Sequence, residues 1–464
     1  MKRLVVAILF VVSVGPALAH AALAGAGFPR PTVIDKSRVI QAGPANYLAL
    51  LAKLRPGDTL MLAPGNYGVD SSGRDTPDGP GLPLQGLNGT ADAPIIITGP
   101  ESGPPAVLLG RSSHNTIRFA NSSYVIVRYL HVDNRQTIAA AVATEGVSHH
   151  VMIEHLTIYG LGERQQIVAI SCVQGPTWNW TVRENLIISP GTGMYFGNSD
   201  GRWPFVAGLI ERNVIRDSIG YNIEFKHQVA WTGIPAGMPT EPTATVVRYN
   251  ILTKRSAFVS ADGARPNLLV GDQPPTGPGS RNRFEIYGNF IYQNPTESLF
   301  QGEGNIAFHD NVLMNTGGSA VRIQRHNGLV RQVEIFHNTI VARDGGINVT
   351  GGRAGSRQIV VANAVFAEAP IRVEGADATQ SDNTTGSLKD AATYLAHPDG
   401  PLEVLDLRPR DERLAGTKLE PAHLADYLDA NLDFARQPRV REQRGAYLYQ
   451  GEQAARPAGS DLKR

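Results

Sequence analysis

The sequence predicts an all-β solenoid, a single-stranded right-handed parallel β-helix, and three observations support that class. One short phrase recurs along the chain: apolar and polar residues alternate, an Asn follows, and a few mostly apolar residues come next. The alternation has the period of a strand, and no repeat holds an apolar period long enough for a helix. Successive copies lie 22 to 39 residues apart. A unit of this length can bury its apolar face only against its neighbours, as in a solenoid.

The recurring Asn predicts an internal ladder. Each copy of the phrase aligns on one residue, and these key positions are His155, Asn185, Asn213, Asn250, Asn289, Asn311, Asn338 and Asn363. An amide stacked coil on coil at an inward bend can pair with backbone groups that the bend leaves open. We therefore expect the seven Asn to form one inward ladder in a β-helix of about ten coils.

A second short strand is expected in several repeats, at 221–228, 256–263, 320–327 and 345–352. Side chains alternate between core and solvent along a strand. In 221–228, Ile223 and Phe225 take the core side, so Glu224 and Lys226 face solvent. The same alternation turns Asp262 and Arg322 outward in later coils. The outward residues of successive coils should form one row along the β-helix, an outward file in which neighbours are one strand spacing apart.

The two ends of the chain differ from the repeats. The helical spacing of 47–54 predicts a short helix that caps the open end, where a bare coil would expose sheet edges. Helical spacing returns at 388–400 and 421–434, within an irregular C-terminal cap. The expected organisation is a signal peptide (1–21), an N-terminal arm (22–44), the β-helix (45–375), a cap with short helices (376–450) and a disordered tail (451–464).

Three phrases carry a resemblance to a known superfamily. LRPGDTLMLAPGNY at 54–67 and PIIITGPESG at 94–103 resemble the opening coils of chondroitinase B and alginate lyases, and RQPRVREQRGAYLYQ at 436–450 resembles the closing phrase of many β-helix proteins. With the repeats, they make the chain from about 45 to 450 similar to the right-handed β-helix superfamily of pectate lyases, chondroitinase B and alginate lyases. The resemblance implies a pectin lyase-like fold that acts on carbohydrate.

The chain also departs from patterns known in that superfamily. It has no spaced Asp pair of the polygalacturonase kind and no Asp-Pro-His-Asp sequence like that of mannuronan epimerases. The acidic calcium-binding cluster of the calcium-dependent pectate lyases is not evident. The Lys and Arg of chondroitinase B map only loosely, Lys226 for the Lys and Arg265 or Arg322 for the Arg.

Composition limits the partners and the compartment. The formal net charge of +1 and the lack of a basic run argue against nucleic acid, and they require any attraction to an acidic sugar to be local. Lys2 and Arg3 precede an apolar run and small residues, as in a secretory signal. The run is too short for a membrane span, so we expect a protein exported by a bacterium to the periplasm or the medium, and a monomer. The single Cys172 cannot form an internal disulfide.

Long insertions single out the face that carries Glu224 and Lys226. They occur at 197–208, 231–243 and 264–283, after the second strand of adjacent coils. Loops that flank one face of a regular scaffold are a usual way to build a cleft. We expect these three loops to lie on one side of the β-helix and to wall a groove with Lys226 at its floor.

The residues of this face suit β-elimination from a uronic acid chain. That reaction needs a neutralised carboxylate, a base for the C5 proton and an acid for the leaving oxygen. The predicted catalytic residues are Lys226, as the base, with His227, Arg322 and His326. The predicted substrate-binding residues are Glu224, Asp262, Arg265, Arg325, Trp203 and Trp231, of which the arginines suit carboxylates and the tryptophans suit sugar rings.

Three function classes stay open at this point. The first is a polysaccharide lyase or uronate epimerase acting on an acidic glycan. The second is a non-catalytic glycan-binding or surface structural protein, and the third is a glycoside hydrolase, which needs paired carboxylates. No cofactor or metal is expected, with calcium held by Glu224 and Asp262 as the alternative. The alternative interpretation of these residues is structural: an exposed Lys on a strand is usually a solvated residue, and Arg322 and His326 can instead pair with a nearby Glu or Asp.

Overall fold

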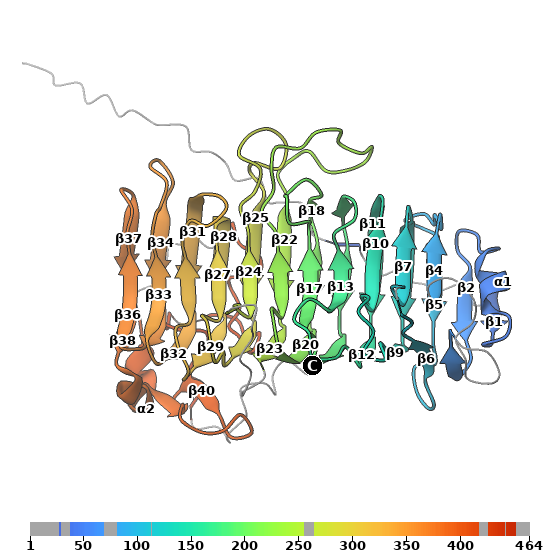
Figure 1. Cartoon of the computed structure of the whole chain (residues 1–464). Helices are drawn as coiled ribbons and strands as arrows, with labels where there is room; N and C mark the ends of the chain where they lie inside the picture. Colours follow the sequence, from blue (N-terminus) through green and yellow to red (C-terminus); the bar gives the residue numbers. More distant parts are fainter. Residues whose placement is uncertain are drawn as a thin grey trace, which may run out of the picture.

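A computed structural model describes residues 27–28, 38–68, 81–112, 114–254, 264–416, 426–440 and 442–451. The expected signal peptide and most of the expected tail lie outside these residues. Three long parallel sheets wind around one axis, which confirms the right-handed parallel β-helix (Figure 1). Within each coil the chain passes from sheet 1 to sheet 2 and then to sheet 3.

Sheet 1 has fifteen strands, thirteen of which form one continuous path. In path order they are β1 (Val39–Ala42), β2 (Thr59–Leu62), β5 (Ile95–Thr98), β8 (Ser123–Arg128), β11 (Ser148–Glu154), β15 (Thr181–Arg183), β19 (Leu209–Glu211), β22 (Ala244–Arg248), β25 (Arg283–Tyr287), β28 (Gly304–His309), β31 (Val330–Phe336), β34 (Gln358–Val361) and β37 (Ala378–Ser381). Beside this path, β14 (Thr177–Trp178) pairs with β11 and with β18 (Phe205–Val206).

Sheet 2 has twelve strands, and their order along the sheet follows the chain. They are β3 (Gly65–Tyr67), β6 (Ala106–Leu109), β9 (Leu130–Asp133), β12 (Thr157–Tyr159), β16 (Leu186–Ile188), β20 (Val214–Ser218), β23 (Ile251–Lys254), β26 (Phe290–Tyr292), β29 (Val312–Asn315), β32 (Thr339–Ala342), β35 (Ala364–Phe366) and β38 (Thr384–Gly386).

Sheet 3 has eleven strands, also in chain order. They are β4 (Leu82–Gln85), β7 (Ile117–Ala120), β10 (Val142–Glu145), β13 (Val168–Cys172), β17 (Thr192–Phe196), β21 (Ile223–Phe225), β24 (Leu268–Val270), β27 (Phe300–Gly302), β30 (Val321–Ile323), β33 (Gly345–Val349) and β36 (Ala369–Val373). The β-helix therefore spans 39–386, longer at both ends than the expected 45–375, and it has a few more coils than expected.

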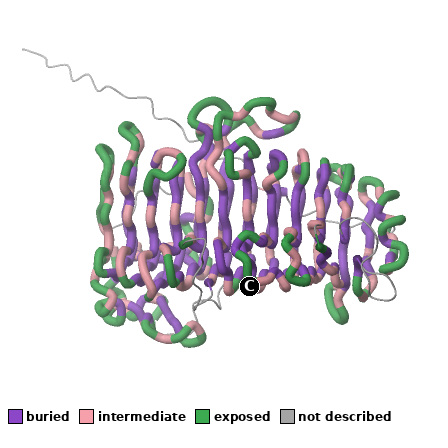
Figure 2. The backbone as a smooth tube through the Cα atoms, viewed as in Figure 1, coloured by how far each residue is buried: buried purple, intermediate pink, exposed green. Residues whose placement is uncertain are grey.

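The inward residues of all three sheets form one apolar core that runs the length of the solenoid. Figure 2 shows this as buried strands with exposed turns. The helix α1 (Tyr47–Leu51) lies at the open end, as expected, and buries Tyr47 and Leu51 in the same core. Cys172 is fully buried, and burial raises the pKa of its thiol, which keeps it unreactive at neutral pH.

The Asn ladder is confirmed at the corner between sheets 1 and 2. Every amide from Asn185 to Asn363 donates to the side-chain oxygen of the next Asn at 2.9–3.1 Å, and Asn383 extends the ladder by one coil. Each of these oxygens also accepts the backbone N–H of the preceding ladder residue. The backbone N–H at each of these bends thereby has a partner.

His155 is the one key position that was misaligned. Leu156 takes the ladder place in that coil, and its backbone N–H donates to the side-chain oxygen of Asn185 at 2.9 Å. His155 precedes the corner and has a left-handed φ of 53°, like Glu184 at 55° and Tyr249 at 57° in other coils. The misalignment has a simple cause. An alternating apolar strand precedes both His155 and the ladder Asn residues, but His155 lies one residue before the ladder position of its coil.

Both terminal segments pack on the outside of sheets 1 and 2. Phe28 is 3 % exposed and lies against Ile96, Ile126 and Met152 of sheet 1. The C-terminal cap contains η2 (Leu388–Asp390), α2 (Ala391–Tyr394), η3 (Glu412–Leu414) and an antiparallel hairpin of β39 (Leu395–His397) and β40 (Asp406–Pro409). The cap covers later strands of sheets 1 and 2. Where a helix was predicted at 421–434, the described residues 426–434 form turns instead.

Removing one ladder amide should measurably destabilise the fold. We expect Asn250→Leu to lower the free energy of unfolding by about 1–3 kcal/mol, because it leaves buried backbone groups without partners. The matched control is Asn327→Leu, at an exposed position. Chemical denaturation of both variants checks the difference, and equal stability of the two would contradict a stabilising ladder.

Candidate active site on the outer face of sheet 3

Strand β21 positions the central pair of the candidate site. Ile223 and Phe225 are buried in the core, as predicted, so Glu224 and Lys226 lie on the outer face. Lys226 Nζ is 2.7 Å from a carboxylate oxygen of Glu224. Glu224 is only 2 % exposed although it points away from the core, because neighbouring side chains cover it. The result is a carboxylate–ammonium pair that is shielded from most of the solvent.

Two tyrosines lie beside this pair. Tyr195 of β17 is the strand partner of Glu224, and Lys226 Nζ lies 5.4 Å from the centre of its ring. Tyr221 precedes β21, and its ring centre is 5.8 Å from the guanidinium carbon of Arg265. Arg265 therefore reaches the site from the next coil. The site thus combines one buried carboxylate, two cations and two phenols.

Burial sets the charge states of these groups. Burial raises the pKa of Glu224, while the charges of Lys226 and Arg265 oppose that rise. Burial also raises the pKa of Tyr195 and Tyr221 well above the ordinary phenol value, and the negative charge of Glu224 raises both further. Both phenols consequently keep their protons at neutral pH and can donate them.

A second ion pair extends the site toward the C-terminus. Arg322 of β30 donates to Glu297 at 3.0 Å, and both side chains are partly exposed. Glu297 is close enough to Tyr221 for its charge to raise the pKa of that phenol. In the outward file of sheet 3, Leu269 and Gln301 lie between Glu224 and Arg322. Arg322 is therefore three strand spacings from Glu224, a distance of about 14 Å.

The strand predicted at 256–263 lies outside the described residues, and β24 is the strand that pairs with β21 in the following coil. Leu268, Leu269 and Val270 pair with β21, and Leu269 lies opposite Glu224 where Asp262 was expected. Asp262 lies outside the described residues, so its role as a substrate or calcium ligand stays a prediction. Leu268 and Val270 supply the inward apolar pair of this strand.

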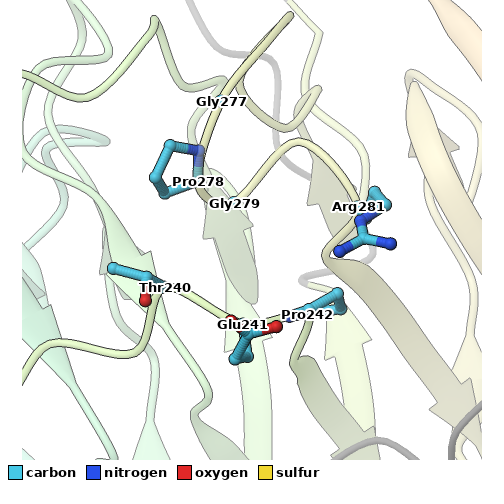
Figure 3. Close-up of a pocket in the computed structure, with 7 residues that line it drawn as sticks. All are labelled: Thr240, Glu241, Pro242, Gly277, Pro278, Gly279 and Arg281. Carbon is cyan, nitrogen blue, oxygen red and sulfur yellow. The ribbon is translucent and has the colours of Figure 1, made fainter.

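The three long loops share one corner, as predicted, between sheets 3 and 1. Val229 N donates to Gly201 O at 3.1 Å, Gln228 N donates to Asp272 O at 2.8 Å, and Gly279 packs against the Trp231 ring. The third loop is shorter than expected, because the first part of 264–283 contains β24. A pocket of ≈ 320 Å³ lies between the loops (Figure 3), and it is lined by Thr240, Glu241, Pro242, Gly277, Pro278, Gly279 and Arg281.

No predicted catalytic residue lines that loop pocket. Lys226 instead lies at the base of the first loop, where its Cβ faces Gly197. Trp203 in this loop is 44 % exposed, so its ring is available to a ligand. Trp231 is half-buried, and its ring nitrogen donates to Gln228 at 3.0 Å, which fixes the second loop.

The remaining predicted residues are next to Lys226 in sequence or in the turn after β30. His227 follows Lys226, and its Nδ1 is buried without a hydrogen-bond partner. His326 and Arg325 are exposed in the turn after β30, where Glu303 accepts the backbone N–H of His326 at 2.9 Å. Glu303 also accepts two further backbone N–H groups of this turn, so it holds the turn and is not a free catalytic carboxylate.

Sequence reasoning missed Tyr195, Tyr221, Glu297 and Lys254. Tyr195 could have been found by extending the outward file one coil earlier, because Met194 and Phe196 alternate inward around it. Lys254 ends β23 of sheet 2, so it is not part of the outward file of sheet 3. It is 7 % exposed, and its Nζ donates to Arg265 O at 2.7 Å.

One group of potential metal ligands was found elsewhere among the described residues. Glu154, His155 and Glu184 lie together at the corner between sheets 1 and 2. Arg183 binds Glu154 at 2.8 Å, and His155 binds Glu184 at 2.9 Å. These contacts explain the group as an ion-pair network, so we assign no metal to it.

The chain was compared with known proteins. No protein-family model matches it, and no curated protein matches it. It is similar to the solved structure of an alginate lyase from Paenibacillus sp. str. FPU-7, at 17 % identity and a TM-score of 0.36, over 68 % of this chain and 100 % of that chain.

Two further solved structures are similar over most of the chain. Pectate lyase Pel9A has 12 % identity and a TM-score of 0.42, over 84 % of this chain and 94 % of that chain. The GH136 lacto-N-biosidase from Eubacterium ramulus has 10 % identity and a TM-score of 0.41, over 76 % of this chain and 68 % of that chain. No residue of the site is assigned from these likenesses.

A glycine next to the central pair provides a test of how tightly the site is packed. A Cβ at Gly271 would collide with the backbone of Lys226 and His227, so Gly271→Ala should displace β24 from β21. We expect a loss of about 1–3 kcal/mol in the free energy of unfolding. Gly43→Ala is the matched control, because nothing lies within 4 Å of its added Cβ. Thermal unfolding of both proteins checks this, and a Gly271→Ala protein as stable as the control would contradict the close approach.

Proposed function

We propose that this protein is an exported polysaccharide lyase that cleaves an acidic, uronate-containing glycan by β-elimination on the outer face of sheet 3. The observation that carries the proposal is the ion pair of the buried Glu224 with the partly exposed Lys226, with Tyr195 and Arg265 beside it. The described parts of both terminal segments pack on sheets 1 and 2, which leaves this face to solvent. Among the described residues, every helix is too short or too polar to cross a lipid bilayer.

Lys226 acts as the base in this proposal. A lysine paired with a carboxylate is ordinarily charged and cannot take a proton. Burial raises the pKa of Glu224, however, which lowers the cost of moving a proton from Lys226 to that carboxylate. A bound sugar would exclude more water and favour the neutral pair further. The neutral amine of Lys226 then takes the C5 proton of the uronate.

Tyr195 supplies the proton for the leaving group. When Lys226 takes the C5 proton, the electrons of that C–H bond form the C4–C5 double bond, and the C4–O bond breaks. The leaving oxygen takes the phenolic proton of Tyr195, which is held at neutral pH by burial and by Glu224. Lys226 then returns a proton to Tyr195 and regains its own from Glu224. No water or other reactant is consumed.

Arg265 neutralises the substrate carboxylate. Its guanidinium is partly exposed and reaches the site beside Tyr221. Neutralising the carboxylate makes the C5 proton more acidic, which is the largest electrostatic demand of this reaction. Arg322 lies farther along the same face and would contact a neighbouring sugar, as the open face allows a chain to lie across several coils.

The Lys226→Met variant tests the site. It keeps the length of the side chain and loses the amine, so we expect it to fold and to lose essentially all turnover. The substrates are alginate, pectate, chondroitin and bacterial exopolysaccharides, and the readouts are the ultraviolet absorbance of an unsaturated uronate and the number of reducing ends. Lys389→Met, at an exposed position of η2, is the control and should keep wild-type rates.

The outcomes of this panel separate the alternatives. Reducing ends without absorbance would indicate a glycoside hydrolase, and a change of uronate stereochemistry without cleavage would indicate an epimerase. Binding without any product would indicate a glycan-binding protein. Wild-type turnover by Lys226→Met would overturn the assignment of the base.

Tyr195→Phe tests the proton donor separately. The variant removes one hydroxyl and keeps the ring that packs beside Lys226, so substrate affinity should change little. We expect kcat to fall by about 10²–10⁴-fold, the usual contribution of a positioned general acid. Steady-state kinetics on the substrate found in the panel check this. A variant with raised KM and unchanged kcat would assign Tyr195 to binding.

A further inference from the structure

A buried lysine beneath the site is not used by the proposed reaction. Lys254 ends β23 and is 7 % exposed, so it cannot touch a polysaccharide directly. Its Nζ donates to the carbonyl oxygens of Arg265 at 2.7 Å and Ile219 at 3.4 Å. Lysine is almost never buried without a carboxylate partner, and here the two hydrogen-bond partners are neutral carbonyls.

The bond to Arg265 links Lys254 to the candidate site. Arg265 is held at its backbone by two donors, because Asn294 also donates to its carbonyl oxygen, at 2.8 Å. Its guanidinium extends from this fixed point toward Tyr221. The position of the cation that would bind the substrate carboxylate thus depends partly on Lys254.

Burial also makes the charge of Lys254 sensitive to its surroundings. The pKa of Lys254 is lowered to about 7, mainly by burial and also by the charge of Arg265, while the charge of Glu297 opposes the decrease. The strand partner of Lys254 is the neutral Ser218. An anion bound to Arg265 would offset the positive charge that now disfavours protonation of Lys254, and its pKa would rise.

We propose that Lys254 is a positioning residue that holds Arg265 in place and takes up a proton when an acidic sugar binds to Arg265. The inference rests on the proposed function, because it takes an acidic glycan as the ligand. Protonation strengthens the hydrogen bond to the Arg265 carbonyl, since charged donors bond more strongly than neutral ones. Binding of the substrate and ordering of its carboxylate-binding residue are therefore coupled.

The coupling predicts the sign of the pH dependence. Below pH 7, Lys254 is already protonated, so ligand binding takes up little. Above pH 7, free Lys254 is increasingly neutral, and binding must draw a proton from solution. Affinity for an acidic ligand should therefore fall as pH rises from 6 to 9, by up to about tenfold for each unit by which the ligand raises the pKa.

Calorimetry can measure this uptake directly. Oligosaccharides of alginate, pectate and chondroitin are titrated into Tyr195→Phe, which slows turnover and keeps the Glu224–Lys226 pair. Each titration is done at pH 7.5 in phosphate and in Tris, whose different ionisation heats reveal the number of protons exchanged. We expect a net uptake of a fraction of a proton, and none in Tyr195→Phe/Lys254→Met. Tyr195→Phe/Lys389→Met is the control and should keep the uptake.

The outcomes distinguish this inference from the proposed function. Met fits a buried apolar position, and Asn294 still binds the Arg265 carbonyl, so the Lys254→Met protein should fold; its thermal unfolding is measured alongside. Two results overturn the inference and leave the proposed function standing. One is binding with equal proton uptake by Tyr195→Phe and Tyr195→Phe/Lys254→Met, and the other is binding by Tyr195→Phe without any uptake. If none of the three oligosaccharides binds, both are overturned.

Discussion

The amide stack at the corner between sheets 1 and 2 is the contact on which the rest of the structure depends. A parallel coil must turn sharply out of each strand, and here the residue before the turn takes a left-handed conformation, as Glu184, Tyr249 and Asp310 do with φ of 52–57°. Such a conformation is costly for a residue with a side chain. The ladder amide satisfies the backbone groups that the turn exposes, and it joins each coil to the next. Leu156 shows that the same turn forms before the ladder begins, with the neighbouring Asn185 still accepting its N–H.

The stacking of coils explains where the candidate site lies. Because the coils stack in register, the outward residue of one sheet 3 strand lies directly beside that of the next strand. Tyr195 and Glu224 become neighbours in this way although they are far apart in sequence. The described terminal segments cover parts of sheets 1 and 2, and the long loops all leave at the corner after sheet 3. Sheet 3 is thus the face that the described terminal segments leave uncovered.

Much of the fold could be predicted from the sequence, since both the ladder and the inward pair Ile223 and Phe225 follow from local period and residue type. The strand that follows β21 in sheet 3 could not be found from local period and residue type. The repeat that contains it is the longest, and it has two apolar runs, at 256–263 and at 268–270. A better signal was present: Asn222 precedes Ile223 as Asn267 precedes Leu268, and both Asn side chains are fully buried at the corner before sheet 3. Lys254 Nζ contacts carbonyl oxygens of its own coil and of the preceding coil, so no periodicity within one strand reveals its burial.

Buried carboxylates occur on two faces of this solenoid, and their partners differ. On sheet 1, Glu211 lies against Arg248 at 2.8 Å, with Arg212 and Arg183 also within ion-pair distance. This carboxylate is surrounded by cations that are held in the same sheet. On sheet 3, Glu224 has a single lysine in ion-pair contact, and its pKa is raised by burial. Lysine, unlike arginine, can give up its proton when desolvated. The buried carboxylate of sheet 1 is therefore paired with arginines and that of sheet 3 with a lysine, and this difference in pairing distinguishes the candidate site from the other charged clusters described here.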